Sequence, residues 1–387
     1  STPSNSSAAS DVYKRQRRRP AIMWSLLALL FWGYIAMVLF NINDNQKKLE
    51  KSAYQQWHST YVKKSSVGTF VKTNPKEEID ISLSEGHGYG MLITMEAVKR
   101  GWASEKDFNE LYQYYKNFQI SKDNPLMSWQ QTYEANKPIK KEATNATDSD
   151  LDIAYALIEA SKQWPNSQTD YKAAAKKLLL GIKARNYNST NKLLTVGDWA
   201  TKDSDSYNLI RPSDIVPSYF DTFAAFSGDN FWRTLKESSV KTLENLSNQH
   251  KTGLLPDFAW VEKDMVTPAK KNQIAGANDG NYGANACRIP WRLASSNDKD
   301  VNQVLSKMMN FFLEKNTINE GYTLSGKSLS SNQSKSFSAP ILYAANQKEA
   351  YGNLINSQGW VITDGLSGED YYGDTLTTLI TLQMNPK

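Results

Sequence analysis

The 387-residue sequence predicts an all-α fold, in which a transmembrane helix precedes a toroid of helical hairpins. Two observations favour this fold. Apolar residues recur at helical spacing in one segment after another, and short loops rich in Asn, Gly, Pro and Ser separate these segments. Alternation typical of strands is rare. Since no linker divides residues 67–387, we expect them to form one large domain.

The first predicted element is a transmembrane helix at residues 21–40, which read AIMWSLLALLFWGYIAMVLF. This run has no charged side chain and is long enough to span a bilayer. The residues before it carry most of the net charge of +5, from Lys14, Arg15, Arg17, Arg18 and Arg19 against Asp11. The positive-inside rule therefore predicts that residues 1–20 are a basic cytoplasmic tail and that the chain from residue 41 lies outside the cell.

A cleaved signal peptide is the alternative to this anchor. Signal peptides have a shorter apolar core and a small-residue cleavage site, whereas this run ends in Leu39-Phe40-Asn41 without an A-x-A pattern. We therefore expect a single-pass protein of the cell membrane with an uncleaved signal anchor. Residues 1–13 are polar and low in complexity and begin without Met, so their native origin stays open.

The following elements are expected to be helices. Residues 41–66 are polar with scattered aromatics and are interpreted as a stalk. Ser104 and Asp107 form a capping-box pattern that opens a helix through Phe118. Similar apolar periodicity predicts helices at residues 148–163, 170–184, 217–226, 229–247, 299–315 and 372–384.

Composition excludes several classes of function. No basic cluster follows residue 20, so we do not expect a nucleic-acid partner. With Cys287 as the only cysteine and 3 His in the chain, we expect no internal disulfide, no metal and no cofactor. The 11 Trp and 20 Tyr are unusually many and suggest a surface that stacks on flat ligands.

The segment SEGHGYGM at residues 84–91 combines Glu85 with three alternating glycines, before a predicted helix from Met91 to Val98. Glycine allows a backbone to approach a ligand closely or to adopt positive φ. In a partly dry aromatic setting Glu85 would have a raised pKa, as a general acid requires. The alternative, which the local pattern alone favours, is a glycine-rich turn with an ordinary surface Glu.

Three acids at alternate positions, Asp148, Asp150 and Asp152, open the helix predicted at residues 148–163. Capping and the helix dipole explain one of them, but three exceed what capping requires. A calcium loop is a competing interpretation, although this segment lacks the Gly at position six and the Glu at position twelve of such a loop.

The segment NACRIPWR at residues 285–292 has two arginines and a Trp around a helix-breaking proline. Arg288 could bind a carboxylate bidentately, and a structural ion pair is the alternative. Cys287 is expected to be a small buried apolar residue rather than a nucleophile.

Together with ATDSDLDIAYALIEASKQW at residues 146–164, these segments resemble glycoside hydrolase family 8 in content and order. The resemblance covers roughly residues 67–384, and Ser149 departs from the family signature. It implies an (α/α)6 barrel and inverting hydrolysis of β-1,4-linked polysaccharides such as cellulose, mixed-linkage glucan, xylan or chitosan. An inverting enzyme needs a general acid and a base, with a water molecule between the base and the sugar.

The resemblance also implies roles for individual residues. Glu85 resembles the general acid, and Asp148 resembles the carboxylate that binds and distorts the sugar at the cleavage point. Residues that resemble the substrate-binding groups of the cleft are Trp129, Arg288, Tyr371 and Tyr372.

The general base is the point where the sequence departs from the family. Asn285 stands where one branch has Asp, and Ala275 stands where another branch has Glu. Neither side chain accepts a proton at neutral pH. The base is therefore unassigned, with Asp279 and Asp257 as candidates.

We expect an outward-facing, membrane-anchored endo-β-glycanase that trims a polysaccharide at the cell surface, with β-glucan as the first substrate to consider. Its expected partners are the polysaccharide, the membrane through residues 21–40, and a polysaccharide synthesis or export machinery. Two alternatives stay open. One is a binding or accessory protein that kept the cleft and lost turnover. The other is specificity for chitosan or xylan.

Overall fold

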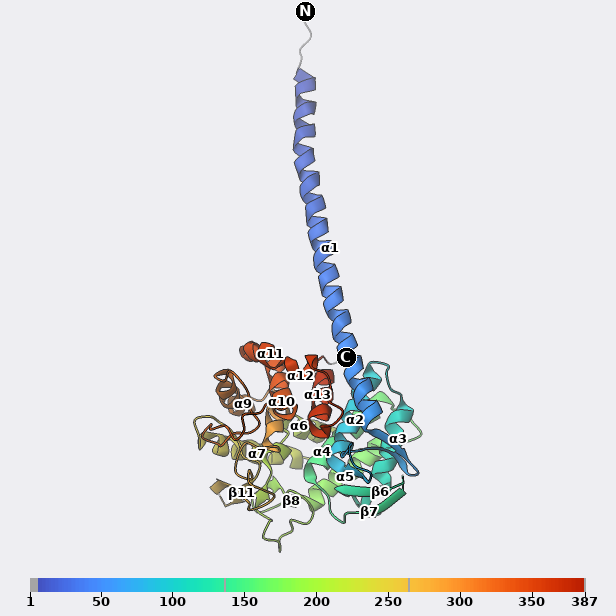
Figure 1. Ribbon diagram of the computed structural model, residues 1–387, viewed down its shortest axis with the longest axis vertical. Coiled ribbons are helices and arrows are strands. Elements are labelled where there is room, and N and C mark those ends of the chain that lie inside the picture. The colour runs from blue at the N-terminus through green and yellow to red at the C-terminus, as the bar shows by residue number, and fades with distance from the viewer. Residues whose placement is uncertain (1–5, 136, 264, 386–387) are drawn as a thin grey trace, which may run out of the picture. The chain divides into compact units, whose positions relative to one another are not determined.

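The computed structural model describes residues 6–135, 137–263 and 265–385, and the first five residues of the expected basic tail lie outside the described residues. The chain divides into two compact units, with the boundary between Ser52 and Ala53. The first unit consists of the greater part of one helix, α1 (Ser6–Tyr61), which is drawn in blue in Figure 1.

Helix α1 contains the expected membrane span. Its segment from Trp24 is long and apolar enough to cross a membrane, with a window of mean hydropathy 2.0 and none of that window buried. Apolar side chains lie exposed all along it, among them Leu30 and Phe40, which are 71% and 72% exposed. Such exposure is costly in water and suits a lipid environment.

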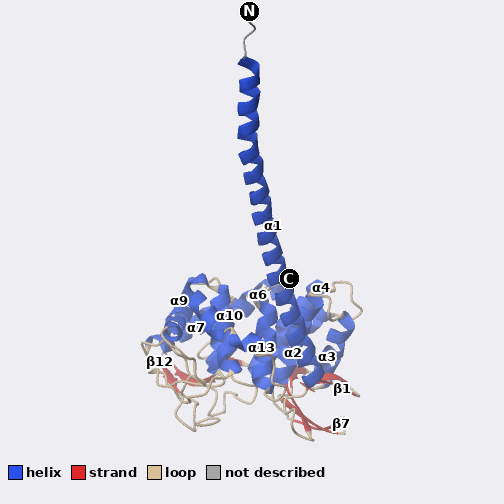
Figure 2. Cartoon of the chain, turned by 45° about the horizontal axis from the view of Figure 1, so that its top comes forward, coloured by secondary structure: helices blue, strands red, loops and turns tan. Residues whose placement is uncertain are grey.

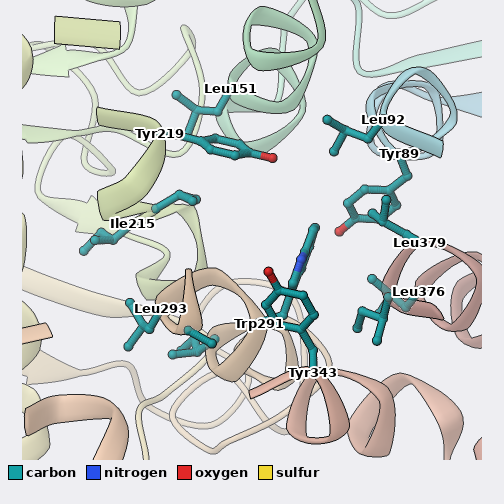
Figure 3. Packing of buried hydrophobic residues seen from close by; sticks show 14 of the residues in the cluster. Tyr89, Leu92, Leu151, Ile215, Tyr219, Trp291, Leu293, Tyr343, Leu376 and Leu379 are labelled. Carbon is teal, nitrogen blue, oxygen red and sulfur yellow. The ribbon is translucent and has the colours of Figure 1, made fainter. Parts of the chain in front are cut away.

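Six inner helices form a closed ring in the second unit. Each contacts the next, and the last contacts the first. In chain order they are α2 (Ser84–Lys99), α4 (Thr147–Gln163), α6 (Pro217–Ser227), α8 (Ile289–Ala294), α10 (Lys335–Gln347) and α13 (Tyr371–Gln383). Side chains from these helices point toward the middle of the ring, as Figure 3 shows for Tyr89, Trp291 and Tyr343.

An outer layer of helices packs against this ring (Figure 1). It contains α3 (Glu105–Asn117), α5 (Tyr171–Arg185), α7 (Phe231–Asn248), α9 (Lys299–Leu313), α11 (Gly352–Gln358) and α12 (Trp360–Thr363). Outer helices such as α3 and α9 bury one apolar face and expose a polar one. The fold is an (α/α)6 barrel, and the helices expected from periodicity are confirmed to within about two residues at each end.

The last turns of α1 belong to the barrel and correct the expected stalk at residues 41–66. Trp57 and Tyr61 are fully buried. Trp57 Nε1 donates to Thr375 Oγ1 at 3.0 Å, and Tyr61 Oη donates to Asp374 Oδ2 at 2.6 Å. With Tyr54, these aromatics recur at helical spacing and form the apolar stripe of an outer helix. The compact unit therefore begins at Ala53 rather than at residue 67.

Short antiparallel strands lie in the loops of the second unit, and Figure 2 shows β12 on one side of it and β1 and β7 on the other. The strands are β1 (Val62–Ser65), β2 (Gly68–Val71), β3 (Asp80–Leu83), β4 (Gln119–Ser121), β5 (Asn124–Met127), β6 (Gln130–Glu134), β7 (Lys137–Lys141), β8 (Tyr187–Asn188), β9 (Leu193–Leu194), β10 (Leu209–Ile210), β11 (Ala259–Glu262) and β12 (Met265–Pro268). Three single-turn 3₁₀ helices complete the elements, η1 (Pro212–Asp214), η2 (Ala286–Arg288) and η3 (Glu349–Tyr351). Strands of two to five residues are too short to show alternation in the sequence.

The glycine-rich segment is helical, which corrects the turn expected before Met91. Helix α2 begins at Ser84, directly after strand β3. A Cβ on Gly86 would lie 2.6 Å from Tyr371 Oη, and one on Gly90 would lie 2.7 Å from Val71 Cγ2. The glycines therefore admit close packing of neighbouring protein side chains onto α2, with no positive φ at these two positions.

Candidate active site

Four residues at the N-terminal ends of four inner helices meet at one end of the barrel. Glu85 lies in the first turn of α2, Asp148 in the first turn of α4, and Tyr371 is the first residue of α13. Arg288 ends η2, immediately before α8. Helix N-termini carry partial positive charge and favour carboxylates at these positions. The structure thus brings together four residues that the sequence separates by up to 286 positions.

Arg288 joins the two carboxylates of this group. Its side chain is fully buried, and its Nη1 lies 2.6 Å from Asp148 Oδ2 and 3.4 Å from Glu85 Oε2. The second nitrogen, Nη2, donates to Ser213 Oγ at 2.8 Å and to Asn285 Oδ1 at 3.2 Å. Nη1 thus contacts both carboxylates, whereas Nη2 contacts neutral groups. The bidentate pair with a single carboxylate, which the sequence allowed, is not found.

Asp148 is ionised at neutral pH because two arginines surround it. Arg211, which the sequence did not single out, places its Nη1 3.2 Å from Asp148 Oδ2. Burial acts to raise the pKa of Asp148, but Arg211 and Arg288 outweigh it and hold the pKa well below the ordinary value. The two cations also neutralise the charge that burial would otherwise make costly.

Glu85 has the opposite shift. Burial raises its pKa above the ordinary value, Arg288 opposes this rise, and the negative charge of Asp148 adds to it. Tyr371 Oη donates to Glu85 Oε1 at 3.3 Å, and a quarter of the Glu85 side chain stays exposed. Two neighbouring carboxyl groups whose pKa values are driven apart can serve as proton donor and fixed anion.

The two candidate bases differ in how their oxygens are used. Asp279 accepts four backbone N–H bonds through both oxygens, from Ile274, Ala275 and Gly276, and so closes its own loop. In Asp257, Oδ1 accepts the N–H groups of Gly283, Asn285 and Ala286, whereas no hydrogen bond reaches Oδ2 within the described residues.

Asp257 is connected to Glu85 through Asn285 and Arg288. Its Oδ1 holds the N–H of Asn285, whose own side chain accepts from Arg288. Burial raises the pKa of Asp257 to about 6, against the lowering effect of the backbone N–H bonds. Asp257 can therefore exchange a proton near neutral pH.

Asp214 is a buried acid that sequence reasoning missed. It is 5% exposed, and neither side-chain oxygen has a hydrogen-bond partner among the described residues. Arg211 Nη1 lies 3.8 Å from its Oδ1. Burial raises the pKa of Asp214 to about 7 even though Arg211 lowers it. Nothing in its local sequence, RPSD, distinguishes this residue from a surface turn.

Two exposed tryptophans stand in segments that are connected by hydrogen bonds to the segments that carry the two carboxylates. Trp129 is 38% exposed, and its carbonyl accepts the N–H of Ser84, the residue before Glu85. Trp199, also missed in the sequence, is 44% exposed and follows Asp198, which accepts the N–H of Asn145 just before α4. Exposed indole rings at these positions can stack on the apolar faces of sugar rings.

Tyr371 and Tyr372 have different surroundings. Tyr371 contacts Glu85 directly, whereas Tyr372 Oη donates to the carbonyl of Ala284 at 2.7 Å, in the loop before η2. Cys287 is fully buried beside Tyr372, with Sγ 3.6 Å from its hydroxyl. Among residues 6–135, 137–263 and 265–385, no group of three His, Cys, Asp or Glu side chains could hold a metal ion.

The profile of a known family, described as Glycosyl hydrolases family 8, matches residues 27–385. The chain belongs to glycosyl hydrolase family 8. It is therefore a glycoside hydrolase of the inverting type, as the resemblance implied, and the match begins well before the domain start expected at residue 67.

Similar proteins share both sequence and fold with this family 8 chain. A β-glucanase from Niallia circulans is 33% identical, over 87% of this chain and 83% of its own. The structure of a β-1,3-1,4-glucanase from Paenibacillus sp. X4 has a TM-score of 0.79 at 31% identity and covers 88% of this chain and 92% of its own. A cold-adapted family 8 xylanase shares the fold, with a TM-score of 0.72 at 19% identity over 88% and 91% of the two chains.

Proposed function

We propose that this family 8 chain is a membrane-anchored endo-β-glucanase that cleaves β-1,4 bonds of a glucan at the outer cell surface. The observation that carries the proposal is the bridge from Glu85 through Arg288 to Asp148, with opposite pKa shifts on the two carboxyl groups. The names of the relatives that are 31% and 33% identical support glucan as the substrate class.

In the proposed reaction Glu85 protonates the glycosidic oxygen as the bond breaks. Its raised pKa keeps it protonated above the range of an ordinary Glu. Asp148, held ionised by two arginines, accepts hydrogen bonds from the sugar at the cleavage point and stabilises positive charge on the ring. Trp129 and Trp199 stack on neighbouring sugar rings.

For the base we favour Asp257 over Asp279. Its Oδ2 has no hydrogen bond within the described residues, and its pKa of about 6 suits proton uptake from water. Asp279 uses both oxygens to hold backbone N–H groups. Asn285 then orients Arg288 through its carbonyl oxygen and takes no proton.

The membrane anchor supports a role at the cell surface. Helix α1 is long and apolar enough to span a bilayer, and the basic residues before it favour a cytoplasmic N-terminus. An enzyme tethered in this way acts on polysaccharide that is made or displayed at the same surface. A polysaccharide synthesis or export machinery is the partner that this placement implies.

A second candidate function is polysaccharide binding without turnover. The observation that favours it is the absence of a carboxylate at both Asn285 and Ala275. In this alternative the carboxylates and tryptophans bind glycan, and no group activates water. Chitosan is a polycation, and the near-neutral balance of residues 21–387 argues against it as the preferred ligand.

The experiment is to incubate the full chain, in a detergent without a sugar head group, with mixed-linkage β-glucan, cellulose, xylan and chitosan. The proposal predicts new reducing ends from β-glucan, in the α-anomeric form when the products are followed by NMR immediately after cleavage. Binding to β-glucan without new reducing ends would favour the second candidate. New reducing ends from xylan or chitosan but not from β-glucan would overturn the choice of substrate.

A further inference from the structure

A cavity opens at the end of the barrel opposite the candidate active site. It has a volume of about 310 Å³ and is lined from all six inner helices. The lining comes from the C-terminal halves of α2, α4, α10 and α13, whereas Glu85 and Asp148 lie in the first turns of their helices. The volume falls in the range of small-molecule sites, roughly 300–1,000 Å³. No catalytic-site residue described above lines this cavity.

The lining residue Arg292 is held in a fixed position by its ion pair and by stacking. Arg292 is 2% exposed, and its two terminal nitrogens donate to Asp152 Oδ1 and Oδ2 at 2.6 and 2.7 Å. The guanidinium carbon lies 4.1 Å from the ring centre of Trp291, so stacking also holds the group in place.

The charges around the cavity are already compensated. Glu96 binds Lys99 at 2.8 Å and Arg100 at 2.9 Å, and Glu159 binds Lys162 at 2.9 Å. Arg292 is paired with Asp152. Among the described residues, these charged groups of the lining therefore leave no uncompensated charge that would attract an anion or a cation. The remaining polar groups of the lining are neutral, and some have protein partners: Thr222 Oγ1 donates to the carbonyl of Ser218, and Tyr343 Oη shares a hydrogen bond with Ser295 Oγ.

These neutral groups and the aromatic rings match a sugar. Ser218, Thr222 and Gln347 line the cavity together with the phenols of Tyr155 and Tyr343. Burial raises the pKa of both phenols, so they stay protonated and can donate.

The aromatic part of the lining comes from three helices. The rings of Tyr155 and Tyr219 stack at 4.2 Å with an interplanar angle of 11°. Figure 3 shows Tyr219, Trp291 and Tyr343 directed toward the centre of the ring from α6, α8 and α10. Flat aromatic faces beside hydroxyl donors and acceptors suit the apolar C–H face and the hydroxyl edge of a pyranose.

We propose that this cavity is a second carbohydrate site, which binds a neutral sugar of one or two rings. The proposal rests on the lining alone and does not depend on which polysaccharide the catalytic end cleaves. It separates a small-sugar site at one end of the barrel from the polymer site at the other.

The test measures binding of glucose and cellobiose to the full chain by saturation-transfer NMR, in a detergent without a sugar head group. Thr222→Trp places a larger side chain in the cavity, Tyr155→Ala breaks the stacked pair and enlarges the cavity, and Trp129→Ala alters only the other end of the barrel. We expect affinity for at least one of the two sugars to fall about tenfold or more in the first two variants, and to persist in Trp129→Ala.

Three results would overturn the proposal. The first is that the wild-type chain binds neither sugar. The second is that both Thr222→Trp and Tyr155→Ala bind the sugars as tightly as the wild type, and the third is that Trp129→Ala loses all binding of the sugars. Circular dichroism melting and retained binding of β-glucan polymer show that a variant has folded. The two cavity variants act by opposite changes in volume, so loss of binding in both while polymer binding persists reports on the cavity.

Discussion

Arg288 Nη1 lies 2.6 Å from Asp148 Oδ2 in a fully buried ion pair, and the same nitrogen extends to Glu85. One guanidinium thus contacts both carboxyl groups of the candidate active site. It holds Asp148 ionised and limits the rise in the pKa of Glu85 that burial causes. The remaining contacts of Arg288 to Ser213, Asn285 and Tyr89 fix its plane.

Replacing Arg288 by Lys retains the charge but loses the planar fork that makes these contacts. We expect kcat/KM on β-glucan to fall about 100-fold, or about 2.7 kcal/mol of transition-state stabilisation. The exposed Arg185→Lys is the matched control and leaves kcat/KM unchanged. Wild-type kinetics in Arg288→Lys would show that a point charge suffices at this position.

The pH profile of hydrolysis reports the pKa of Glu85. In the proposed mechanism activity needs protonated Glu85, so the rate should fall as pH rises through its pKa, which lies above the ordinary value of 4.5. The charge of Asp148 adds to this rise, so Asp148→Asn lowers the pKa of Glu85. We expect the alkaline limb of kcat/KM to move to lower pH in Asp148→Asn, with reduced maximal rate. A limb that stays in place would contradict this coupling.

In the proposed function Trp129 contributes through substrate binding rather than proton transfer. Removing its exposed ring in Trp129→Ala should raise KM about tenfold, about 1.4 kcal/mol, with a smaller change in kcat. Leu180→Ala truncates another exposed apolar side chain, which is 63% exposed on outer helix α5, and should change neither constant. Equal loss of kcat and kcat/KM in Trp129→Ala would instead indicate a role confined to the transition state.

Asp214 makes stability depend on pH. Its folded pKa of about 7 lies above its unfolded value of 3.8. Between these values the folded state binds more protons than the unfolded state, so the free energy of unfolding falls as pH rises. We expect Asp214→Asn to remove this slope, a difference on the order of 3 kcal/mol between pH 4 and 7. Parallel denaturation curves for both proteins across that range would refute the assignment.

The end of α1 stabilises the barrel as an outer helix. Trp57 is fully buried and bonded to Thr375, so Trp57→Ala should cost about 3–5 kcal/mol of unfolding free energy. Gln55→Ala, two residues earlier on the exposed side of the same helix, should cost less than about 0.5 kcal/mol. A small effect of Trp57→Ala would mean that residues 53–61 are dispensable to the fold.

Most of the helices could be predicted because their signal is local. Capping at Ser104 and the apolar stripes of α3 and α9 depend on residues within a few turns of each other. The glycine-rich start of α2 could not be predicted in this way. Its glycines are required by Tyr371 and Val71, which come from distant parts of the chain.

The same distinction between local and distant signals applies to the residues of the candidate site. Glu85, Asp148 and Arg288 stand in recognisable motifs, whereas Arg211 precedes the single-turn helix η1 and Asp214 ends it, in a segment without a pattern, and both join the site only through the fold. The exposure of Trp199 and the free oxygen of Asp257 likewise follow from tertiary packing, which local sequence does not encode.

The most direct test of the proposed chemistry is hydrolysis of mixed-linkage β-glucan by the wild-type chain and by Glu85→Gln, measured as new reducing ends per enzyme. Gln is nearly isosteric with Glu but cannot donate the proton. The account predicts a loss of kcat of about 1,000-fold or more, with polymer binding retained. Hydrolysis at the wild-type rate by Glu85→Gln would contradict the assignment of Glu85 as the general acid.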